Sequence, residues 1–316
     1  MTACLDADVL TVHGALVDIL DRLRAQDYAF ITPTPATHRL AASRRSRARP
    51  GVLTDVFGWA LPFDPDTLPG PLVEALRLAG VLAPDGALFR STVRVSTLED
   101  RLHLHSAPTA ATDAVFFGPD SYRFVRFLAR HLEEDPAFDR ALDIGVGAGA
   151  GALSLAVRRP TAEVIGVDPN PLALTCLAAN ADHQKLHVRG KAGSGLADLE
   201  GSFDVIVANP PYVADRAGRL YRDGGARRGI DLGLSWVAQG VERLAPGGRF
   251  LLYTGSPICD GVDPVRAELI KIARGRGLSL RYEELDPDVF GTLLKEPAYG
   301  EVDRIAAVGA ALVREG

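Results

Sequence analysis

One stretch of the chain, residues 141–151, reads ALDIGVGAGAG. A short apolar run ends in Asp143 and Ile144, and glycines then alternate with small residues until a segment of helical apolar spacing begins. Glycines after a strand let the backbone turn sharply and approach a ligand, and the first amides of the next helix face that ligand. The stretch therefore predicts a strand, a ligand-binding turn and a helix. Alone, it also fits the G-x-G-x-x-A form of an NAD site.

Strands and helices alternate on both sides of this stretch. The predicted strands cover residues 141–146, 163–168, 185–190, 203–209 and 248–255. Residues 121–132, 151–159, 171–181 and 232–245 have the apolar spacing of amphipathic helices. Such alternation is typical of a parallel sheet that is covered on both faces. We therefore predict an α/β fold with a doubly wound, Rossmann-like sheet, whose ligands bind at the carboxyl ends of the strands.

The first 107 residues follow a different pattern. Residues 9–23 and 72–82 read as helices, prolines interrupt residues 33–71, and residues 88–96 and 100–106 alternate as a pair of strands. This order is winged-helix-like. We predict a helical and β-hairpin domain over residues 1–107, with a packing or substrate role, and a ligand-binding domain over residues 108–316.

Two further polar motifs follow predicted strands. Asp168 ends the second strand, where a carboxylate can accept hydrogen bonds from both ribose hydroxyls of a nucleoside; a solvated N-cap aspartate is the alternative. Asn-Pro-Pro-Tyr at residues 209–212 ends the fourth strand. Its prolines remove two amide donors, so Asn209 and the Pro210 carbonyl become fixed acceptors for a planar NH2 group. Tyr212 can cover the flat face of that group, unless the proline pair merely ends the strand.

With these motifs in this order, residues 115–255 resemble the class I S-adenosylmethionine-dependent methyltransferases. The Asn-Pro-Pro-Tyr signature is similar to that of the HemK/PrmC and N6-adenine amino-methyltransferase group. The resemblance implies a seven-stranded sheet, S-adenosyl-L-methionine as the cofactor and S-adenosyl-L-homocysteine as its product. The residues that it assigns to the cofactor are Asp143, Gly145, Gly147, Gly149, Asp168, Pro169, Asn209 and Phe117. Those that it assigns to orienting the target nitrogen are Asn209, Pro210 and Tyr212.

The resemblance also assigns roles within that set. The glycines and Asp143 would hold the methionine part of the cofactor, and Asp168 its ribose. Phe117 begins a segment, residues 117–121, that sits where HemK/PrmC proteins carry a proline-containing loop before the first helix, and this loop would cover the cofactor. After the third strand the chain reads RGKAGS at residues 189–194 instead of supplying the usual acid, so adenine recognition falls to the backbone or to Asp198.

The implied reaction is an in-line displacement in which a nitrogen attacks the sulfonium methyl, accelerated mainly by positioning. The acceptor would be an amide, amine or guanidinium nitrogen of a small molecule or a protein side chain, with an RNA base as the alternative. An enzyme that uses the aminocarboxypropyl arm of the cofactor, or a non-catalytic scaffold that binds the cofactor, also fits these motifs. An NAD-dependent oxidoreductase predicts a different glycine spacing and no Asn-Pro-Pro-Tyr.

The composition of the chain limits the kinds of partner and ligand that we expect it to bind. The chain has 316 residues, of which 47% are hydrophobic, and a net charge of −5, which is the wrong sign for binding nucleic acid through its phosphates. Five arginines between residues 39 and 49 could still touch RNA or an acidic partner, or form a solvated face. His103 and His105 share a strand face, but no third ligand has metal-site spacing, so we expect no metal. Three distant cysteines and the lack of a long apolar run favour a cytoplasmic protein without a membrane segment. The oligomeric state stays open.

Overall fold

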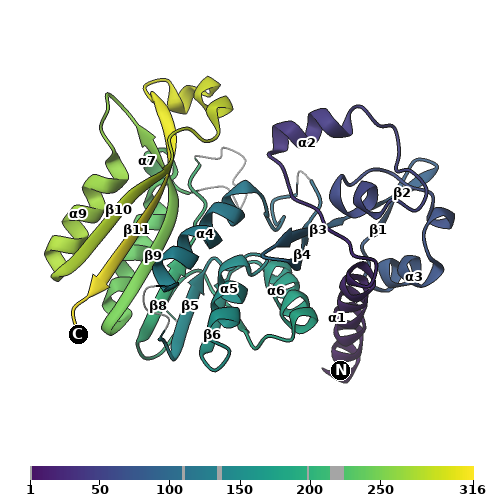
Figure 1. The fold of residues 1–316 in the computed structure, drawn as a ribbon, viewed down its shortest axis with the longest axis horizontal. Coiled ribbons are helices and arrows are strands. Elements are labelled where there is room, and N and C mark those ends of the chain that lie inside the picture. The colour runs from purple at the N-terminus through teal and green to yellow at the C-terminus, as the bar shows by residue number, and fades with distance from the viewer. Residues whose placement is uncertain (1, 109–110, 134–136, 198, 214–223) are drawn as a thin grey trace.

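The computed structural model describes residues 2–108, 111–133, 137–197, 199–213 and 224–316. Figure 1 shows a layered α/β part that holds the C-terminus, beside a part formed by helices and hairpins that holds the N-terminus. Within the described residues, every helix is too short or too polar to span a bilayer.

A seven-stranded sheet with the order β10-β11-β9-β8-β5-β6-β7 forms the layered part. The strands are β5 (Arg140–Ile144), β6 (Glu163–Asp168), β7 (Arg189–Ala192), β8 (Phe203–Ala208), β9 (Leu244–Ile258), β10 (Leu278–Asp286) and β11 (Arg304–Arg314). The pairs from β7 to β9 are parallel, and β11 runs antiparallel to both β9 and β10. The predicted doubly wound sheet is thus confirmed.

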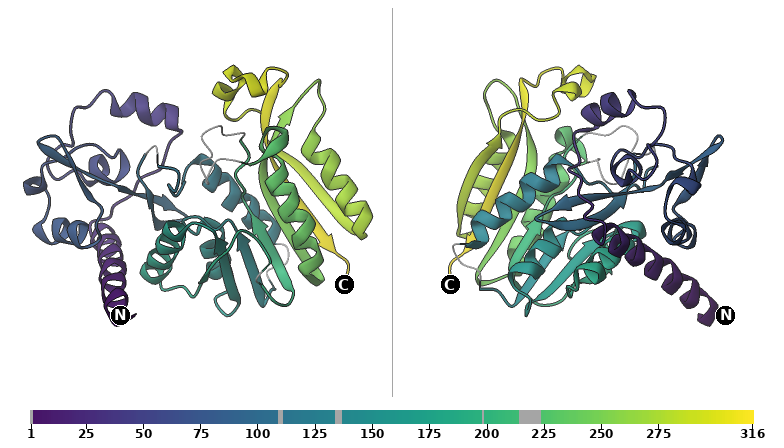
Figure 2. Two further views of the ribbon diagram at one scale, coloured as in Figure 1. Left: turned by 180° about the vertical axis from the view of Figure 1, so that it is seen from behind. Right: turned by 45° about the vertical axis from the view of Figure 1, so that its right-hand side comes forward.

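Helices cover both faces of this sheet. Those in the layered part are α4 (Pro119–Glu133), α5 (Ala150–Arg158), α6 (Pro171–Gln184), α7 (Ala226–Gly229), α8 (Asp231–Gly240) and α9 (Pro264–Arg276). Short turns η3 (Val241–Arg243), η4 (Gly291–Lys295) and η5 (Pro297–Tyr299) complete it. Apolar residues of α4, α5 and α6 share one core with the sheet, and those of α8 and α9 share another. Figure 2 shows the arrangement of these helices around the sheet in two further views. The central strands are apolar on both sides because both sides are covered.

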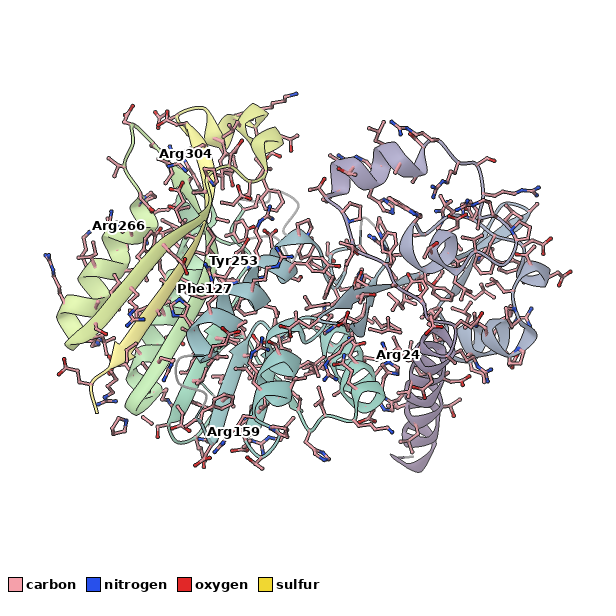
Figure 3. The ribbon with its side chains drawn as sticks, viewed as in Figure 1. Arg24, Phe127, Arg159, Tyr253, Arg266 and Arg304 are labelled. Atoms are coloured by element: carbon pink, nitrogen blue, oxygen red, sulfur yellow. The ribbon has the colours of Figure 1, made fainter. Side chains whose placement is uncertain are left out.

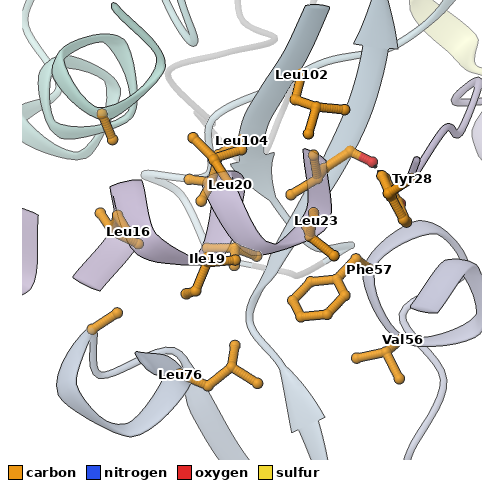
Figure 4. Close-up of a cluster of buried hydrophobic side chains, with 14 of the residues drawn as sticks. Leu16, Ile19, Leu20, Leu23, Tyr28, Val56, Phe57, Leu76, Leu102 and Leu104 are labelled. Carbon is orange, nitrogen blue, oxygen red and sulfur yellow. Dashed lines mark hydrogen bonds between the residues drawn. The ribbon is translucent and has the colours of Figure 1, made fainter. Parts of the chain in front are cut away.

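The N-terminal part has a core of its own. Its elements are α1 (Thr2–Arg24), α2 (Pro35–Ala42), η1 (Thr54–Gly58), η2 (Pro65–Thr67), α3 (Gly70–Leu78), β1 (Leu82–Asp85), β2 (Leu88–Ser91), β3 (Val93–Leu98) and β4 (Arg101–Ser106). Leucines and Ile19 on one face of α1 pack against α3, β4 and Phe57 (Figure 4). The same cluster includes Cys176 and Ala179 of α6, so the two parts share buried apolar surface.

Several predicted elements have different limits. The predicted strand at 88–96 is two strands in separate hairpins, because the Ser91 side chain bonds both the N–H and the carbonyl of Val93 and interrupts the ladder. The helix predicted over 72–82 ends at Leu78, since Gly80 turns with a φ of +67° and Leu82 starts β1. The helix predicted to reach residue 245 ends at Gly240. The third strand starts at Arg189 rather than 185, because α6 extends to Gln184.

The arginine cluster of residues 39–49 is partly structural. Arg49 binds both carboxylate oxygens of the fully buried Asp55, at 2.8 Å and 3.1 Å, and Arg45 adds a bond of 3.2 Å. Burial alone would raise the pKa of Asp55, but the bonds from these arginines outweigh it and hold the pKa below its ordinary value. Two of the five arginines therefore fasten the segment before η1.

Candidate functional site

The three predicted motifs converge at one edge of the sheet. The glycine turn follows β5, Asp168 ends β6, and Asn209 follows β8. These strands are neighbours in the order β8-β5-β6 and run parallel, so their carboxyl ends meet at the same edge. This is where a doubly wound sheet binds its ligands.

The glycine turn has a backbone that side chains rarely adopt. Gly145, Gly147 and Gly149 have φ values of +72°, +52° and +91°. A Cβ on Gly145 would lie 2.7 Å from the Trp236 ring, and one on Gly149 would lie 2.6 Å from Leu177. A Cβ on Gly147 would meet nothing within 4 Å. Side chains therefore pack against the turn at Gly145 and Gly149, whereas the space beside Gly147 is open.

Asp143 lies beneath this turn, and its side chain is 2% exposed. Its Oδ2 accepts a hydrogen bond of 2.7 Å from the N–H of Ala152, in the first turn of α5. The N-cap residue of α5 is a glycine without a capping side chain, so Asp143 supplies the acceptor that the helix start lacks. Burial raises the pKa of the Asp143 carboxyl to about 8, although the Ala152 bond opposes the shift.

Asp168 ties the turn to the end of β6. Its Oδ2 accepts from the N–H of Gly147 and its Oδ1 from the N–H of Asn170, both at 2.9 Å. Burial raises the pKa of Asp168 above its ordinary value, and these two backbone bonds oppose that shift. The next residue, Pro169, is exposed. Asp168 therefore positions the glycine turn as well as facing the place expected for a ribose.

The Asn-Pro-Pro-Tyr residues point in different directions. Asn209 is half-buried, and its side chain makes no hydrogen bond with any other described residue. Pro210 is buried against α8, where a Cβ on Gly233 would lie 2.9 Å from its ring. Tyr212 is 8% exposed, and its ring packs over Gly255 of β9 and lies 5.7 Å from the Phe290 ring. Of these four described residues, only Asn209 has an unpaired polar side chain that is partly exposed at the sheet edge.

The chain returns to this motif at residues 224–229, which directly follow an undescribed segment. Gly224 N–H donates to the Val213 carbonyl at 2.9 Å. A Cβ on Gly224 would lie 2.6 Å from the Pro211 carbonyl, and one on Gly229 would lie 2.6 Å from the Tyr212 backbone. The glycines in this segment therefore allow two backbones to touch beside the signature.

A buried polar group that the sequence did not reveal lies under Tyr212. The hydroxyl of Tyr253, on β9 beneath α4 and labelled in Figure 3, donates to Asp120 Oδ1 at 2.7 Å. Burial raises the pKa of Asp120, which the Tyr253 bond opposes. The Tyr212 hydroxyl also faces Asp120, and this interaction lowers the pKa of Asp120 and raises that of Tyr212, although no hydrogen bond of ordinary geometry joins the hydroxyl to a described residue. The available signal was an acid directly after Pro119, in the first turn of a helix.

Phe117 lies in the core cluster of the N-terminal part, which also includes Ala148 of the glycine turn. Its ring is 4% exposed and stacks on His105 at 5.0 Å, with the His103 ring 5.5 Å away. Both histidines do lie on one face of β4, as predicted. The structure thus places Phe117 between α4 and the hairpin of the N-terminal part. Asp198, considered for adenine recognition, lies outside the described residues.

A second residue that sequence reasoning missed is Asn180 of α6. It is fully buried, accepts from the Leu104 N–H at 2.7 Å, and donates to the carbonyls of Leu104 and Ala148 at 3.0 Å and 2.9 Å. The helix has apolar residues at 173, 176 and 177, so position 180 falls on the buried stripe, and an asparagine there was the available signal. Asn180 joins the glycine turn to β4.

Known proteins agree with this geometry. Residues 115–256 match the family model "Methyltransferase small domain". A release factor glutamine methyltransferase from Deinococcus radiodurans is 40% identical over 126 residues, which are 36% of this chain and 44% of that protein. One from Koribacter versatilis is 36% identical over 137 residues, 39% and 49% of the two chains. The alignments thus span less than half the length of these relatives.

A solved structure shows the same fold. Trm5b from Pyrococcus abyssi aligns with a TM-score of 0.50 and 16% identity, over 74% of this chain and 62% of that chain. Identity at this level shows the architecture and no more. Together, the family match and the curated relatives show that residues 115–256 are similar to the class I S-adenosylmethionine-dependent methyltransferases of the HemK-like group.

Proposed function

We propose that this protein transfers the methyl group of S-adenosylmethionine to a planar nitrogen, and that the acceptor is a side-chain amide of a protein. The observation that carries the proposal is Asn209, a half-buried amide without a described partner at the sheet edge that bears the glycine turn. The relatives are named for methylation of a glutamine in a release factor, and a glutamine amide is a planar nitrogen of this kind.

The residues at the sheet edge fit the cofactor of this family. The middle of the glycine turn is open, so its backbone offers room for a ligand at Gly147. Each Asp168 oxygen uses one lone pair on a backbone amide and keeps capacity to accept a ribose hydroxyl. When bound, S-adenosylmethionine supplies an electrophilic methyl on its sulfonium.

The role of the chain is then positioning. The Asn209 side-chain oxygen and the Pro210 carbonyl accept the two hydrogens of the acceptor NH2, which aims the nitrogen lone pair at the methyl group. Acceptors aimed at the NH2 stabilise the positive charge that develops on nitrogen as it attacks. The Tyr212 ring, wedged over Gly255, stiffens the turn that holds both acceptors.

The remaining assignments are proposals of the same kind. We divide the chain into an N-terminal packing or substrate domain over residues 1–107 and a methyltransferase domain over residues 108–316. The bonds of Asn180 to both parts support a fixed relation between them. A cytoplasmic site of action fits the free thiols of Cys176 and Cys259.

The test is methyl transfer from labelled S-adenosylmethionine to a purified release factor from the same cells, with the modified residue located by mass spectrometry. We expect one methyl group on a glutamine, with S-adenosylhomocysteine as the second product. Label on RNA or on a small metabolite would refute the protein acceptor. Methylthioadenosine as the product would refute methyl transfer itself.

Asn209→Ala is the informative variant, because Asn209 has no described partner whose loss would disturb the fold. We expect cofactor affinity close to that of the wild type and turnover lowered by at least about a hundredfold, the scale seen when a transition-state hydrogen-bonding group is removed. Full turnover in this variant would remove the nitrogen-orienting role.

A further inference from the structure

Arg94 of β3 is a buried cation without a counter-charge among the described residues. The residue is 5% exposed, and its Nε atom has no hydrogen-bond partner. Its single hydrogen bond among the described residues runs from Nη2 to the Thr32 hydroxyl, at 3.1 Å. Burial lowers the pKa of its guanidinium to about 10, which leaves it charged at neutral pH.

The groups around Arg94 do not neutralise it. The Phe30 ring centroid lies 5.5 Å from its Cζ, and Tyr28 and Tyr122 are its nearest ionisable neighbours of opposite sign, both with pKa values raised by burial. No ion pair joins Arg94 to an Asp or Glu within the described ranges, whereas Arg45 and Arg49 of the same part share Asp55. A cation–π contact recovers much less than the cost of burying an unpaired charge.

A series of hydrogen bonds runs from Arg94 through Thr32 and Ser96 to His105, and the donor in each of them is fixed. The Ser106 carbonyl can only accept, so His105 Nδ1 donates to it at 3.0 Å, and neutral His105 then accepts at Nε2 from the Ser96 hydroxyl at 2.7 Å. Burial lowers the pKa of His105 well below its ordinary value, which keeps it neutral. Ser96 must accept from Thr32, and Thr32 from Arg94.

The hydroxyls of Thr32 and Ser96 therefore each donate one hydrogen bond and accept another. Thr32 and Ser96 have no hydrogen left for another acceptor, and they hold one end of the guanidinium in place. The N–H groups that remain belong to Arg94, whose planar fork matches the two oxygens of a carboxylate or phosphate. Thr32 itself is 4% exposed and follows Ile31, which is 65% exposed.

We propose that Arg94 binds an oxyanion, a carboxylate or a phosphate group, at a site held by Thr32 in the N-terminal part. The bound anion supplies the counter-charge that the described part of the protein does not provide and completes the hydrogen bonding of the guanidinium. The proposal does not depend on the proposed methyl transfer, because binding is measured without turnover.

The experiment measures thermal unfolding and calorimetric binding of the full chain in a buffer free of oxyanions. Inorganic phosphate and acetate are titrated separately, with chloride at equal ionic strength as the control. We expect saturable binding of at least one of them and a rise in Tm that chloride does not give. Arg94→Met should abolish that rise and weaken binding at least about tenfold. It should also melt higher than the wild type when no oxyanion is present.

Arg77→Met is the matched control, because Arg77 is an exposed arginine of α3 whose nearest acid is Glu74 at 3.7 Å. It should respond to phosphate and acetate like the wild type. Should Arg94→Met not fold, Arg94→Lys keeps the charge without the planar fork and should bind more weakly than the wild type.

A titration with S-adenosylmethionine distinguishes two sources of the oxyanion: a separate ligand, and the carboxylate of the cofactor itself. Unchanged affinity in Arg94→Met means that the site is distinct from that of the cofactor, whereas a loss comparable to that for acetate means that it takes the cofactor's carboxylate. The inference is overturned if the wild type binds phosphate and acetate no better than chloride and Arg94→Met leaves S-adenosylmethionine binding unchanged.

Discussion

Replacing Asp168 should damage the fold and cofactor binding together. Both carboxylate oxygens accept from buried backbone amides at 2.9 Å, those of Gly147 and Asn170. Hydrogen bonds to a charged group contribute about 1.5–3 kcal/mol each. Since burial raises the pKa of Asp168 and so offsets part of this gain, the lower figure applies. We therefore expect Asp168→Ala to lower the free energy of unfolding by about 3 kcal/mol, and Asp168→Asn, which keeps one acceptor oxygen, by about half as much.

Urea unfolding gives the stability, and calorimetric titration with S-adenosylmethionine gives the affinity. Both changes weaken the hydrogen bond that anchors the Gly147 amide and remove an acceptor for a ribose hydroxyl. The affinity for S-adenosylmethionine should therefore fall at least about tenfold in both variants.

The control is Asp204→Ala. Asp204 Oδ2 likewise accepts two backbone amides, those of Asp139 and Arg140 at 2.8 Å and 2.9 Å, but at the start of β8, the opposite end of the strand from Asn209. This variant should lose a similar or smaller amount of stability and bind the cofactor like the wild type. If Asp168→Ala bound S-adenosylmethionine at wild-type strength, its place in the site would be refuted; wild-type stability would refute the anchoring of the turn.

Four further changes have expected outcomes. Asp143→Asn should flatten the pH dependence of unfolding: the folded-state pKa of about 8 lies above that of the unfolded chain, so this contribution is complete below about pH 4 and disappears as the pH rises through 8, at up to about 1.4 kcal/mol per pH unit. Tyr212→Phe removes a buried hydroxyl that forms no hydrogen bond of ordinary geometry with a described residue, so urea unfolding should show no loss of stability, and a loss above about 1 kcal/mol would contradict this. Asn180→Ala leaves three buried backbone groups without hydrogen-bond partners and should lower the free energy of unfolding by about 3 kcal/mol or more in the same assay. Gly224→Ala pushes a Cβ into the Pro211 carbonyl and should lower turnover, whereas Gly275→Ala, where a Cβ meets nothing within 4 Å, should keep turnover and add about 1 kcal/mol of stability.

The bonds of Asn180 join the N-terminal part to the glycine turn. The same side chain satisfies the Ala148 carbonyl in the glycine turn and both backbone groups of Leu104 in β4. Gln184, one turn later on α6, donates to the Leu102 carbonyl at 2.9 Å. The β4 edge is thus paired by side chains of a helix that also bonds the glycine turn.

Sequence reasoning predicted the sheet because its signal is local. Each central strand is a short apolar run and each covering helix has apolar spacing, and both patterns are written over a few consecutive residues. The same holds for the glycine turn, where positive φ requires glycine, and for a strand that ends in two prolines. Since parallel strands place their carboxyl ends at one edge, the three motifs could be brought together from their order along the chain.

The limits of the N-terminal elements were harder to predict, because a side chain intervened. Alternation continues through residues 88–96, but the Ser91 hydroxyl takes the place of a ladder partner and separates β2 from β3. A serine side chain can compete with a neighbouring strand for backbone hydrogen bonds only in some rotamers, and the packing around it decides which rotamer it adopts. The alternating pattern of the sequence does not show which rotamer that is.

The sequence by itself determined the class of fold and the edge of the sheet at which the glycine turn, Asp168 and Asn209 meet. Only the tertiary structure decided that Asp168 anchors Gly147, that Tyr212 faces inward over Asp120, that Asn180 joins two parts of the chain, and that Arg94 is buried without an acid among the described residues. The physical reason is common to all four. Hydrogen-bond partners and counter-charges are set by which residues meet when distant segments pack, and the spacing of residues along a chain does not specify those meetings.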